Sequence, residues 1–368
     1  MIIFLTRRQG QHIMVALMAR LPKKHRKTKL ARRFRRWFLN SWLLHFAFTT
    51  SVWILGKLPL SVSRCFGRWG GWIAYHLDRG HRTACLDNMA IAFPERSPAQ
   101  HRALAKANYI HLGLCAVDFC QLQDSTAEDI RNYWIVPEPG ARERLQAALT
   151  QGRGAIGVGA HIGFWELTGF ALPSLGFPLT SVARRMASPR LQDCATRFRT
   201  RFGNTVIPQE GALQHVLKTL RANKMVGINM DQYAGAVGPW LPFFAREAST
   251  VSSCAWLHLR TGAPLLCNLM IRRPDGRYTW RCRNIDVPAV AGENREEHVL
   301  RILTECNRDF ESVIRECPEQ WLWMHRRWKP RPLPKELHAG SMAPIAETQK
   351  AERAYDAAGQ AVVQSINP

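Results

Sequence analysis

Short apolar segments alternate with amphipathic segments through the central part of the chain. The apolar segments predict strands at 155–159, 179–183, 205–207, 225–230, 264–271 and 278–282. Helical periodicity predicts helices at 164–175, 189–202, 212–222 and 293–316. Alternation of this kind predicts an α/β fold with a mixed, largely parallel sheet that is covered by helices.

The part of the chain before this region has a different pattern. From Leu60 to Gln123, apolar residues such as Val62, Phe66 and Trp69 recur at helical spacing, which predicts helices. Further upstream, Phe38 to Leu55 is apolar over 18 residues. A membrane span needs about 20 such residues, so this segment predicts an N-terminal hydrophobic membrane helix. The alternative is a helix that lies in the membrane interface.

Charge and composition divide the chain into four predicted segments. Residues 1–36 form a basic leader that we expect to be disordered, and 37–60 a membrane anchor or interfacial helix. Residues 61–334 form the main domain and 335–368 a flexible tail. The net charge is +23, and no acidic residue precedes Asp78. Such basic clusters are typical of contact with anionic lipid or nucleic acid, or of a solvated tail.

The 10 cysteines are scattered, and no two of them form a C-x-x-C pair. Zinc sites and thioredoxin-like redox sites usually have such pairs. Many of the cysteines lie in apolar runs, where a free thiol packs as a small hydrophobic group. We therefore expect reduced thiols in the core and a reducing compartment around the domain.

One motif directly follows the predicted strand at 155–159. His161 comes after the apolar run, and Glu166 follows five positions later. On a continuous helix these side chains would lie about 140° apart. They meet only if His161 is in the loop that leaves the strand and Glu166 in the next helix. We predict a catalytic pair, with His161 as general base and Glu166 orienting its ring.

The residues around this pair resemble a known family. His161, Gly163, Trp165 and Glu166 resemble the His-x4-Glu block of the bacterial lipid A biosynthesis acyltransferases, the lauroyl- and myristoyl-transferases that finish lipid A. Other blocks extend the resemblance, in order, over roughly Arg33 to Pro332. These blocks are Asn88–Pro94, Ser181–Arg184 with Arg197–Gly203, Asp231–Gln232 with Pro242–Phe244, and Trp321–Trp328.

The resemblance implies a function, partners and a location. It implies transfer of a fatty acyl chain from acyl carrier protein to a hydroxyl of a lipid A precursor, which forms an acyloxyacyl ester. It also implies a glycerolipid-acyltransferase-like fold, no metal or nucleotide cofactor, and contact with an anionic membrane rather than nucleic acid. The expected location is the bacterial inner membrane, with the catalytic domain facing the cytoplasm. The chain has no G-x-S-x-G motif, so the acceptor hydroxyl itself would attack the thioester.

Four further residues are predicted to bind substrate. Arg184 and Arg199 are suited to the phosphate groups of a phosphorylated glycolipid. Asp231 and Gln232 follow the predicted strand at 225–230, and site residues gather at the carboxyl ends of strands. The loop after them has aromatic and apolar side chains that either line an acyl-chain channel or pack in the core: Trp240, Leu241, Phe243 and Phe244.

Two other functions stay open at this point. The first is an acyltransferase of the same superfamily with a different glycolipid, phospholipid or polyene acceptor. Glycerolipid enzymes normally carry His-x4-Asp, and Glu166 departs from that pattern. The second is a basic nucleic-acid-binding protein, in which the tryptophans of 321–328 stack on bases. The apolar segment 38–55 argues against it, and the resemblance instead favours a membrane interface for these tryptophans.

Overall fold

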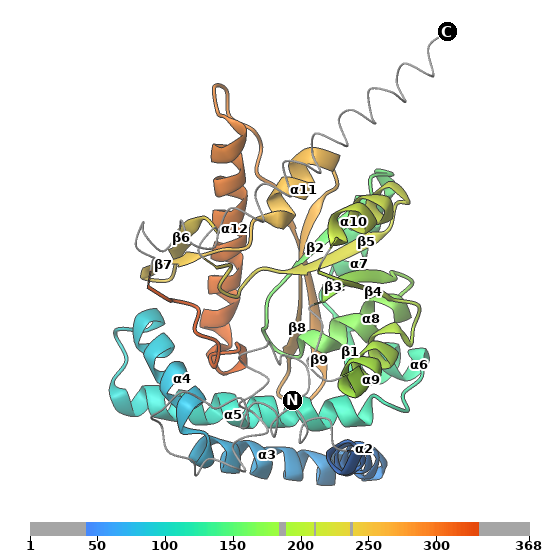
Figure 1. Cartoon of the computed structure of the whole chain (residues 1–368), viewed down its shortest axis with the longest axis vertical. Helices are drawn as coiled ribbons and strands as arrows, with labels where there is room; N and C mark the ends of the chain where they lie inside the picture. Colours follow the sequence, from blue (N-terminus) through green and yellow to red (C-terminus); the bar gives the residue numbers. More distant parts are fainter. Residues whose placement is uncertain (1–41, 184–188, 210, 236–237, 331–368) are drawn as a thin grey trace, which may run out of the picture.

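The computed structural model describes residues 42–183, 189–209, 211–235 and 238–330. The predicted leader at 1–36, the whole predicted tail at 335–368 and Arg184 lie outside these residues. In the described part a seven-stranded sheet forms the centre of the molecule, and helices cover both of its faces (Figure 1). The predicted mixed, largely parallel sheet is confirmed.

The strands of the sheet lie in the order β1-β9-β8-β2-β5-β3-β4. All neighbouring pairs are parallel except β8 and β9, which are antiparallel. Their bounds are Ile135–Pro137 (β1), Ala155–Gly159 (β2), Leu179–Ala183 (β3), Thr205–Pro208 (β4), Met225–Asn229 (β5), Leu265–Arg272 (β8) and Tyr278–Ile285 (β9). A separate hairpin joins Trp240–Phe243 (β6) to Arg246–Ser249 (β7).

Alternation along the strands supplies two cores, one on each face of the sheet. On β8, Leu265 and Cys267 belong to the core on one face, and Leu266 and Met270 to the core on the other. The first core includes Ala212–Arg221 (α10), Ser253–Thr261 (α11) and Arg295–Glu316 (α12). The second includes Ala141–Thr150 (α7) and Thr168–Ser174 (α8). The predicted strands and most of the predicted helices are confirmed in place.

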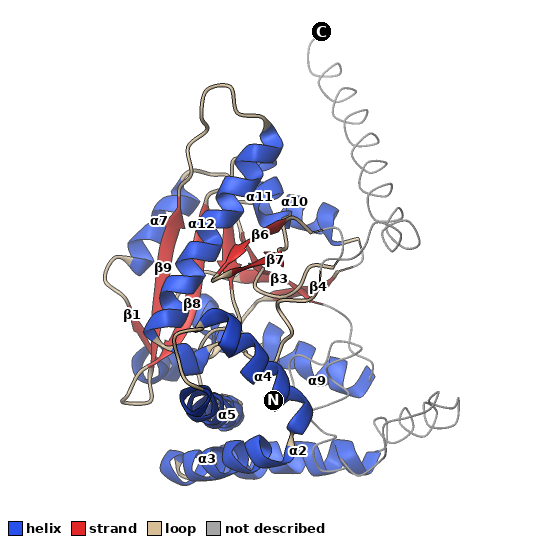
Figure 2. Ribbon diagram, turned by 90° about the vertical axis from the view of Figure 1, so that its left-hand side faces the viewer, coloured by secondary structure: helices blue, strands red, loops and turns tan. Residues whose placement is uncertain are grey.

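The helices of the N-terminal part lie against one edge of the sheet. They are Trp42–Lys57 (α2), Leu60–Leu77 (α3), Arg79–Ala92 (α4) and Pro98–Gln121 (α5). The long α5 begins at a capping box, in which Ser97 and Gln100 satisfy each other's backbone N–H groups. It runs between the sheet and α3 (Figures 1 and 2). Pro189–Thr200 (α9) lies near the far end of α5, where Phe198 contacts Phe119.

The predicted N-terminal membrane helix is wrong. Among the described residues, no helix combines the length and the apolar character that a membrane span requires. Helix α2 ends at Lys57, just after the predicted run, and Pro59 precedes α3, so the two helices do not join into a longer one.

Candidate active site at the carboxyl edge of the sheet

The register of two neighbouring strands determines which residues meet at this edge. In the parallel pair of β2 and β5, Gly159 lies opposite Asn229. His161 and Asp231, each two residues further along, therefore leave the sheet at the same point. The backbone N–H of Met230 donates to the carbonyl of Gly159 at 3.1 Å and extends the pairing by one residue. The result is a histidine beside a carboxylate at the carboxyl ends of parallel strands.

Asp231 holds His161 through both of its carboxylate oxygens. His161 Nδ1 lies 2.6 Å from Oδ1, and the His161 backbone N–H donates to Oδ2 at 2.8 Å. The indole N–H of Trp321 also donates to Oδ2, at 2.9 Å. Only 2% of His161, 2% of Asp231 and 1% of Trp321 are exposed to solvent. The carboxylate is thus fixed from two sides within the protein interior.

The protonation state of this pair follows from its surroundings. Burial alone would raise the pKa of Asp231, but His161 and the hydrogen bonds from His161 and Trp321 lower it to about 2. An ionised carboxylate can only accept hydrogen bonds, so Nδ1 of His161 carries the proton. In a neutral ring, Nε2 is then the basic nitrogen. The geometry thus prepares Nε2 to take a proton from a substrate.

The predicted partner of His161, Glu166, makes a different contact. Glu166 forms a two-pronged ion pair with Arg199 of α9, with Oε1–Nη2 at 3.0 Å and Oε2–Nε at 3.1 Å. The structure therefore brings Asp231, and not Glu166, to Nδ1 of His161. The physical reason is that Glu166 lies in a short 3₁₀ turn at Trp165–Leu167, whereas Asp231 extends the strand next to β2.

The remaining predicted substrate-binding residues have different surroundings. Arg199 already uses two of its N–H groups on Glu166, which raises the pKa of its guanidinium above the usual value. Arg184 lies outside the described residues. Gln232 follows Asp231 directly, and its buried side-chain nitrogen has no hydrogen-bond partner within the described ranges. Among the described residues, the Gln232 amide nitrogen is therefore a donor that is left for a substrate.

The tryptophans of the segment 321–328 are buried, which contradicts the predicted surface role. Trp321, Trp323 and Trp328 are 1%, 0% and 7% exposed, so they can neither stack on nucleic-acid bases nor reach a membrane interface. They pack with Phe243 and Phe244, with Phe243 and Trp328 stacked at 5.7 Å. The sequence left two alternatives for these two phenylalanines, an acyl-chain channel or packing in the core. Their contacts with the buried tryptophans favour packing in the core.

Two buried asparagines hold the backbone of this aromatic segment. Asn88 of α4 donates to the carbonyls of Trp323 and His325 at 2.8 and 2.6 Å. Asn108 of α5 donates to the carbonyl of Trp321 at 2.6 Å. The sequence analysis assigned them no role, and only the position of Asn88 within a family block marked it. These bonds place the Trp321 indole beside Asp231.

Arg327 connects the same segment to the loop after β5. It is 0% exposed and donates to the backbone carbonyls of Gln232 and Ser249 and to the hydroxyl of Thr250. These acceptors are neutral, so burial dominates and lowers the pKa of Arg327 to about 10. Arg327 is thus an internal brace for the backbone of Gln232.

Comparison with known proteins agrees with this arrangement. Residues 28–330 match the family model described as "Bacterial lipid A biosynthesis acyltransferase". The chain belongs to this family.

Curated relatives of the acyltransferase cover most of its length. It is 27% identical over 305 residues to the lipid A biosynthesis palmitoleoyltransferase of Escherichia coli, which covers 82% of this chain and 96% of the relative. It is 24% identical over 287 residues to the lipid A biosynthesis lauroyltransferase of the same organism, with 76% and 90% covered. A phosphatidylinositol mannoside acyltransferase of Mycobacterium tuberculosis matches over 131 residues, at 28% identity, with 34% and 42% covered.

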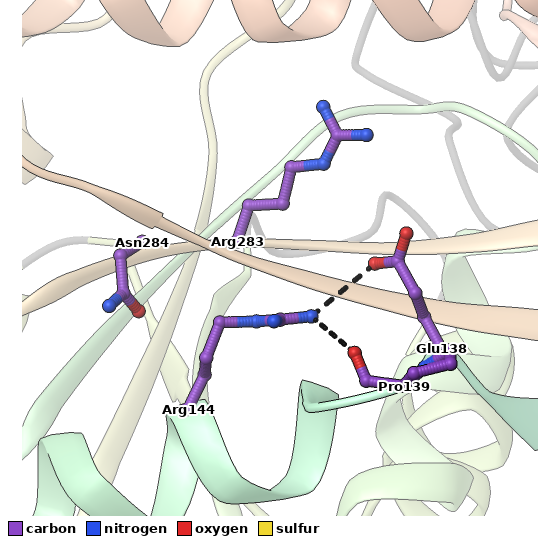
Figure 3. Close-up of a pocket in the computed structure, with 5 residues that line it drawn as sticks. All are labelled: Glu138, Pro139, Arg144, Arg283 and Asn284. Atoms are coloured by element: carbon purple, nitrogen blue, oxygen red, sulfur yellow. Dashed lines mark hydrogen bonds and ion pairs between the residues drawn. The ribbon is translucent and has the colours of Figure 1, made fainter.

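A separate pocket of the acyltransferase lies far from His161. It has a volume of about 510 Å³ and is lined by Glu138, Pro139, Arg144, Arg283 and Asn284 (Figure 3). Arg144 and Glu138 are 3.6 Å apart across it. Arg283 pairs with Cys267 near the start of β8, toward the amino edge of the parallel strands. Because His161 lies at the carboxyl edge, this pocket is not part of the candidate active site.

The Glu166–Arg199 pair predicts a change in stability. We expect Glu166→Ala to lower the free energy of unfolding by about 3 kcal/mol, because it leaves a largely buried guanidinium without its counter-charge. Urea unfolding measures this. Adding Arg199→Met to the variant should restore part of the loss, and Glu143→Ala, at an exposed position of α7, should cost little. A Glu166→Ala protein that unfolds at the wild-type urea concentration would show that the pair contributes no stability.

The stability of the acyltransferase should also depend on pH through His325. Burial lowers the pKa of His325 to about 3, and its Nε2 accepts the backbone N–H of Tyr233 at 2.9 Å. The unfolded chain binds this proton near the usual pKa of about 6.5 and the folded chain does not. The contribution to stability is therefore complete above about pH 6.5 and decreases as the pH falls toward 3.

The variant His325→Gln tests this dependence, because a glutamine oxygen can still accept from Tyr233. Urea unfolding across this pH range should show that the free energy of unfolding depends less on pH in His325→Gln than in wild type. The difference corresponds to at most one proton taken up per molecule on unfolding. His111, whose pKa burial lowers to about 4, should keep part of the dependence. Exposed His215 offers a control, because His215→Gln should behave as wild type. Equal pH dependence in wild type and His325→Gln would exclude His325 as the source.

Proposed function

We propose that the chain transfers a fatty acyl group from an acyl carrier protein thioester to a hydroxyl of a phosphorylated lipid A precursor. The observation that carries this proposal is the Asp231–His161 pair, 2.6 Å apart at the carboxyl edge of the sheet. A hydroxyl is a poor nucleophile at neutral pH and needs a base that removes its proton as the new bond forms. His161, with Nε2 as its basic nitrogen, supplies that base.

The proposed reaction has two steps. The acceptor hydroxyl oxygen attacks the carbonyl carbon of the thioester while His161 Nε2 takes its proton. The tetrahedral intermediate then collapses and expels the pantetheine sulfur, which receives the proton from the imidazolium. Asp231 keeps the ring in one tautomer and stabilises the imidazolium, as the carboxylate does in serine-hydrolase triads. The products are an acyloxyacyl ester and the free thiol, and no acyl-enzyme forms.

Other residues have proposed roles in binding. Gln232 offers its unused amide N–H groups to substrate beside the reacting atoms. We keep Arg184 as a phosphate-binding residue, because it comes directly after Ala183, the last residue of β3, in the sequence. Arg199 keeps a smaller share of that role, since Glu166 occupies two of its N–H groups. We propose that Glu166 acts by positioning Arg199.

The partners and the location follow from the proposed substrates. Acyl carrier protein is acidic and suits a chain of net charge +23. We place the enzyme at the cytoplasmic face of the bacterial inner membrane, where an anionic surface presents the glycolipid. The described cysteines are free thiols, which suits a reducing compartment. The lipid A relatives cover more of the chain than the mannoside relative, which favours the lipid A precursor as acceptor.

Mass spectrometry of lipid A from cells with and without the gene tests the proposed acceptor. Cells that lack the gene should accumulate a lipid A species that is lighter by one acyl chain, and a plasmid copy should restore the heavier species. A plasmid copy with His161→Ala should not restore it. Identical lipid A in all strains would exclude the lipid A precursor as the acceptor and favour another glycolipid.

A further inference from the structure

Apart from Tyr75, helix α3 buries its small residues and leaves its large apolar side chains exposed. Its buried residues recur every fourth position, as Ser63, Gly67, Gly71 and Tyr75. They face α5 so closely that a Cβ added to Gly67 would lie 2.8 Å from the carbonyl oxygen of Gly113. Small residues allow two helix backbones to approach in this way. The large apolar side chains of α3 consequently face away from the protein.

Those side chains form a continuous exposed stripe, which we call the α3 apolar face. At 100° per residue, the stripe lies opposite the buried positions. Its members are between 38% and 58% exposed: Val62, Phe66, Trp69, Trp72, Ile73 and Leu77. The neighbouring α2 adds Trp53, which is 64% exposed. Contiguous apolar surface of this kind marks an interaction site, whereas single exposed apolar residues are ordinary.

The α3 apolar face lies on the same side of the molecule as the candidate active site. Helix α5 separates α3 from the sheet (Figures 1 and 2). On its inner side, α5 touches the loop after His161, where the ring of His111 lies 3.2 Å from the carbonyl oxygen of Gly163. In space, α5 therefore lies between the carboxyl edge of the sheet and α3. A surface that covers α3 would lie one helix layer from the catalytic edge.

The charges around this face suit a negatively charged surface. Neither α2 nor α3 contains an acidic residue, and Asp78 is the first in the whole chain. Lys57 and Arg68 are exposed beside the apolar side chains, and Lys57 pairs with exposed Asp124 at 2.9 Å. Arg64 instead turns inward and binds buried Asp118 at 2.8 Å. Lys57 and Arg64 are thus each balanced by an aspartate, and Arg68 leaves a net positive charge at the face.

We propose that the α3 apolar face lies along the headgroup region of an anionic bilayer and docks the catalytic edge of the sheet toward the membrane. An exposed helix with large apolar and tryptophan side chains beside basic residues is the pattern of an interfacial helix. A second copy of the chain would leave the basic residues facing one another. The proposal rests on the proposed function in one respect: docking brings the catalytic edge near a lipid acceptor.

Vesicle sedimentation with the full-length chain tests the docking. The variant carries Phe66→Ser, Trp69→Ser and Ile73→Ser, and the vesicles contain phosphatidylglycerol and phosphatidylethanolamine. At ~1 M salt, where the screening length is about 3 Å, electrostatic binding by the basic leader is suppressed. Under that condition we expect the partition coefficient to fall by roughly 100-fold, because three large apolar side chains no longer leave water. Circular dichroism should show an intact fold, since all three positions are exposed.

A matched control replaces apolar side chains at the opposite end of the molecule. The variant Trp256→Ser, Val290→Ser and Leu300→Ser changes exposed residues around α11 and the start of α12, and it should bind vesicles as wild type does. At ~0.15 M salt, wild type should bind these vesicles more tightly than vesicles of phosphatidylcholine.

Two outcomes would overturn the proposal. One is equal sedimentation of wild type and the α3 variant. The other is a lipid-free dimer, seen by light scattering, that the α3 variant abolishes while its vesicle binding is unchanged. In that case a second copy covers the face. Since binding is measured without donor or acceptor, a negative result leaves the proposed function intact. In detergent, where docking is not needed, a wild-type chain that transfers no acyl group would contradict the proposed function and leave the docking proposal standing.

Discussion

Replacing His161 by alanine is expected to lower kcat for acyl transfer by roughly 10²–10⁴, the usual loss when a general base is removed. The hydroxyl must then lose its proton to water, which is a weak base and is not positioned. The fold should survive, because the backbone N–H of residue 161 and the Trp321 indole still bind Asp231. Steady-state kinetics with a purified acyl carrier protein thioester measures the effect.

The control for this prediction is a histidine outside the site. His215 lies on the exposed side of α10, and His215→Ala should keep wild-type kcat. If His161→Ala also kept near-normal turnover, the base would have to be another group and the assignment would fail.

Replacing Asp231 by asparagine is expected to reduce kcat by a similar or larger factor, up to about 10⁴. The change conserves the shape of the side chain but removes its charge. An amide can present its N–H₂ group to Nδ1, which would then act as the acceptor and leave the proton on Nε2. The ring would be held in the wrong tautomer for a base. KM should change much less than kcat, because Asp231 acts through His161 and is 2% exposed.

Asp286→Asn provides the matched control, since Asp286 is an exposed aspartate after β9. It should have wild-type kinetics. The comparison with Glu166→Ala is informative as well. If Asp231→Asn were fully active and the Glu166 variant had lost only kcat while remaining stably folded, Glu166 would be the orienting carboxylate after all.

Local patterns in the sequence predict much of the central fold. Alternating apolar and amphipathic segments predicted β2, β3, β4 and β5 and the helices that connect them, because each element shows its own periodicity. Strand β1, helices α7 and α11 and the β6–β7 hairpin were not predicted. Most of these are short, and short segments carry few periodic positions.

The candidate site shows where sequence reasoning stops. It identified His161 correctly as a residue at the end of a strand, but it paired the histidine with the nearest carboxylate in the chain. The contact with Asp231 depends on β5 lying next to β2, and the order of strands in a sheet is not encoded in any local pattern. The same limit applies to Arg327 and to the tryptophans of 321–328, whose burial arises from contacts with distant segments.

The helix α3 shows a second limit. Its apolar residues were recognised as helical, and such periodicity normally marks the face that enters a core. In the structure this face is exposed, because Gly67 and Gly71 make the opposite side the better surface for close packing on α5. Helical spacing gives the position of an apolar stripe, but not whether protein or another phase covers it.

The most direct test of the account is the product formed from purified components. The full-length chain is mixed in detergent with an acyl carrier protein thioester and a phosphorylated glucosamine disaccharide that carries 3-hydroxyacyl chains. Mass spectrometry should find the acceptor heavier by one fatty acid less one water, with the new ester on a 3-hydroxyl. The His161→Ala chain should form almost none. Free fatty acid in place of this ester, or equal product from both chains, would contradict direct acyl transfer by the Asp231–His161 pair.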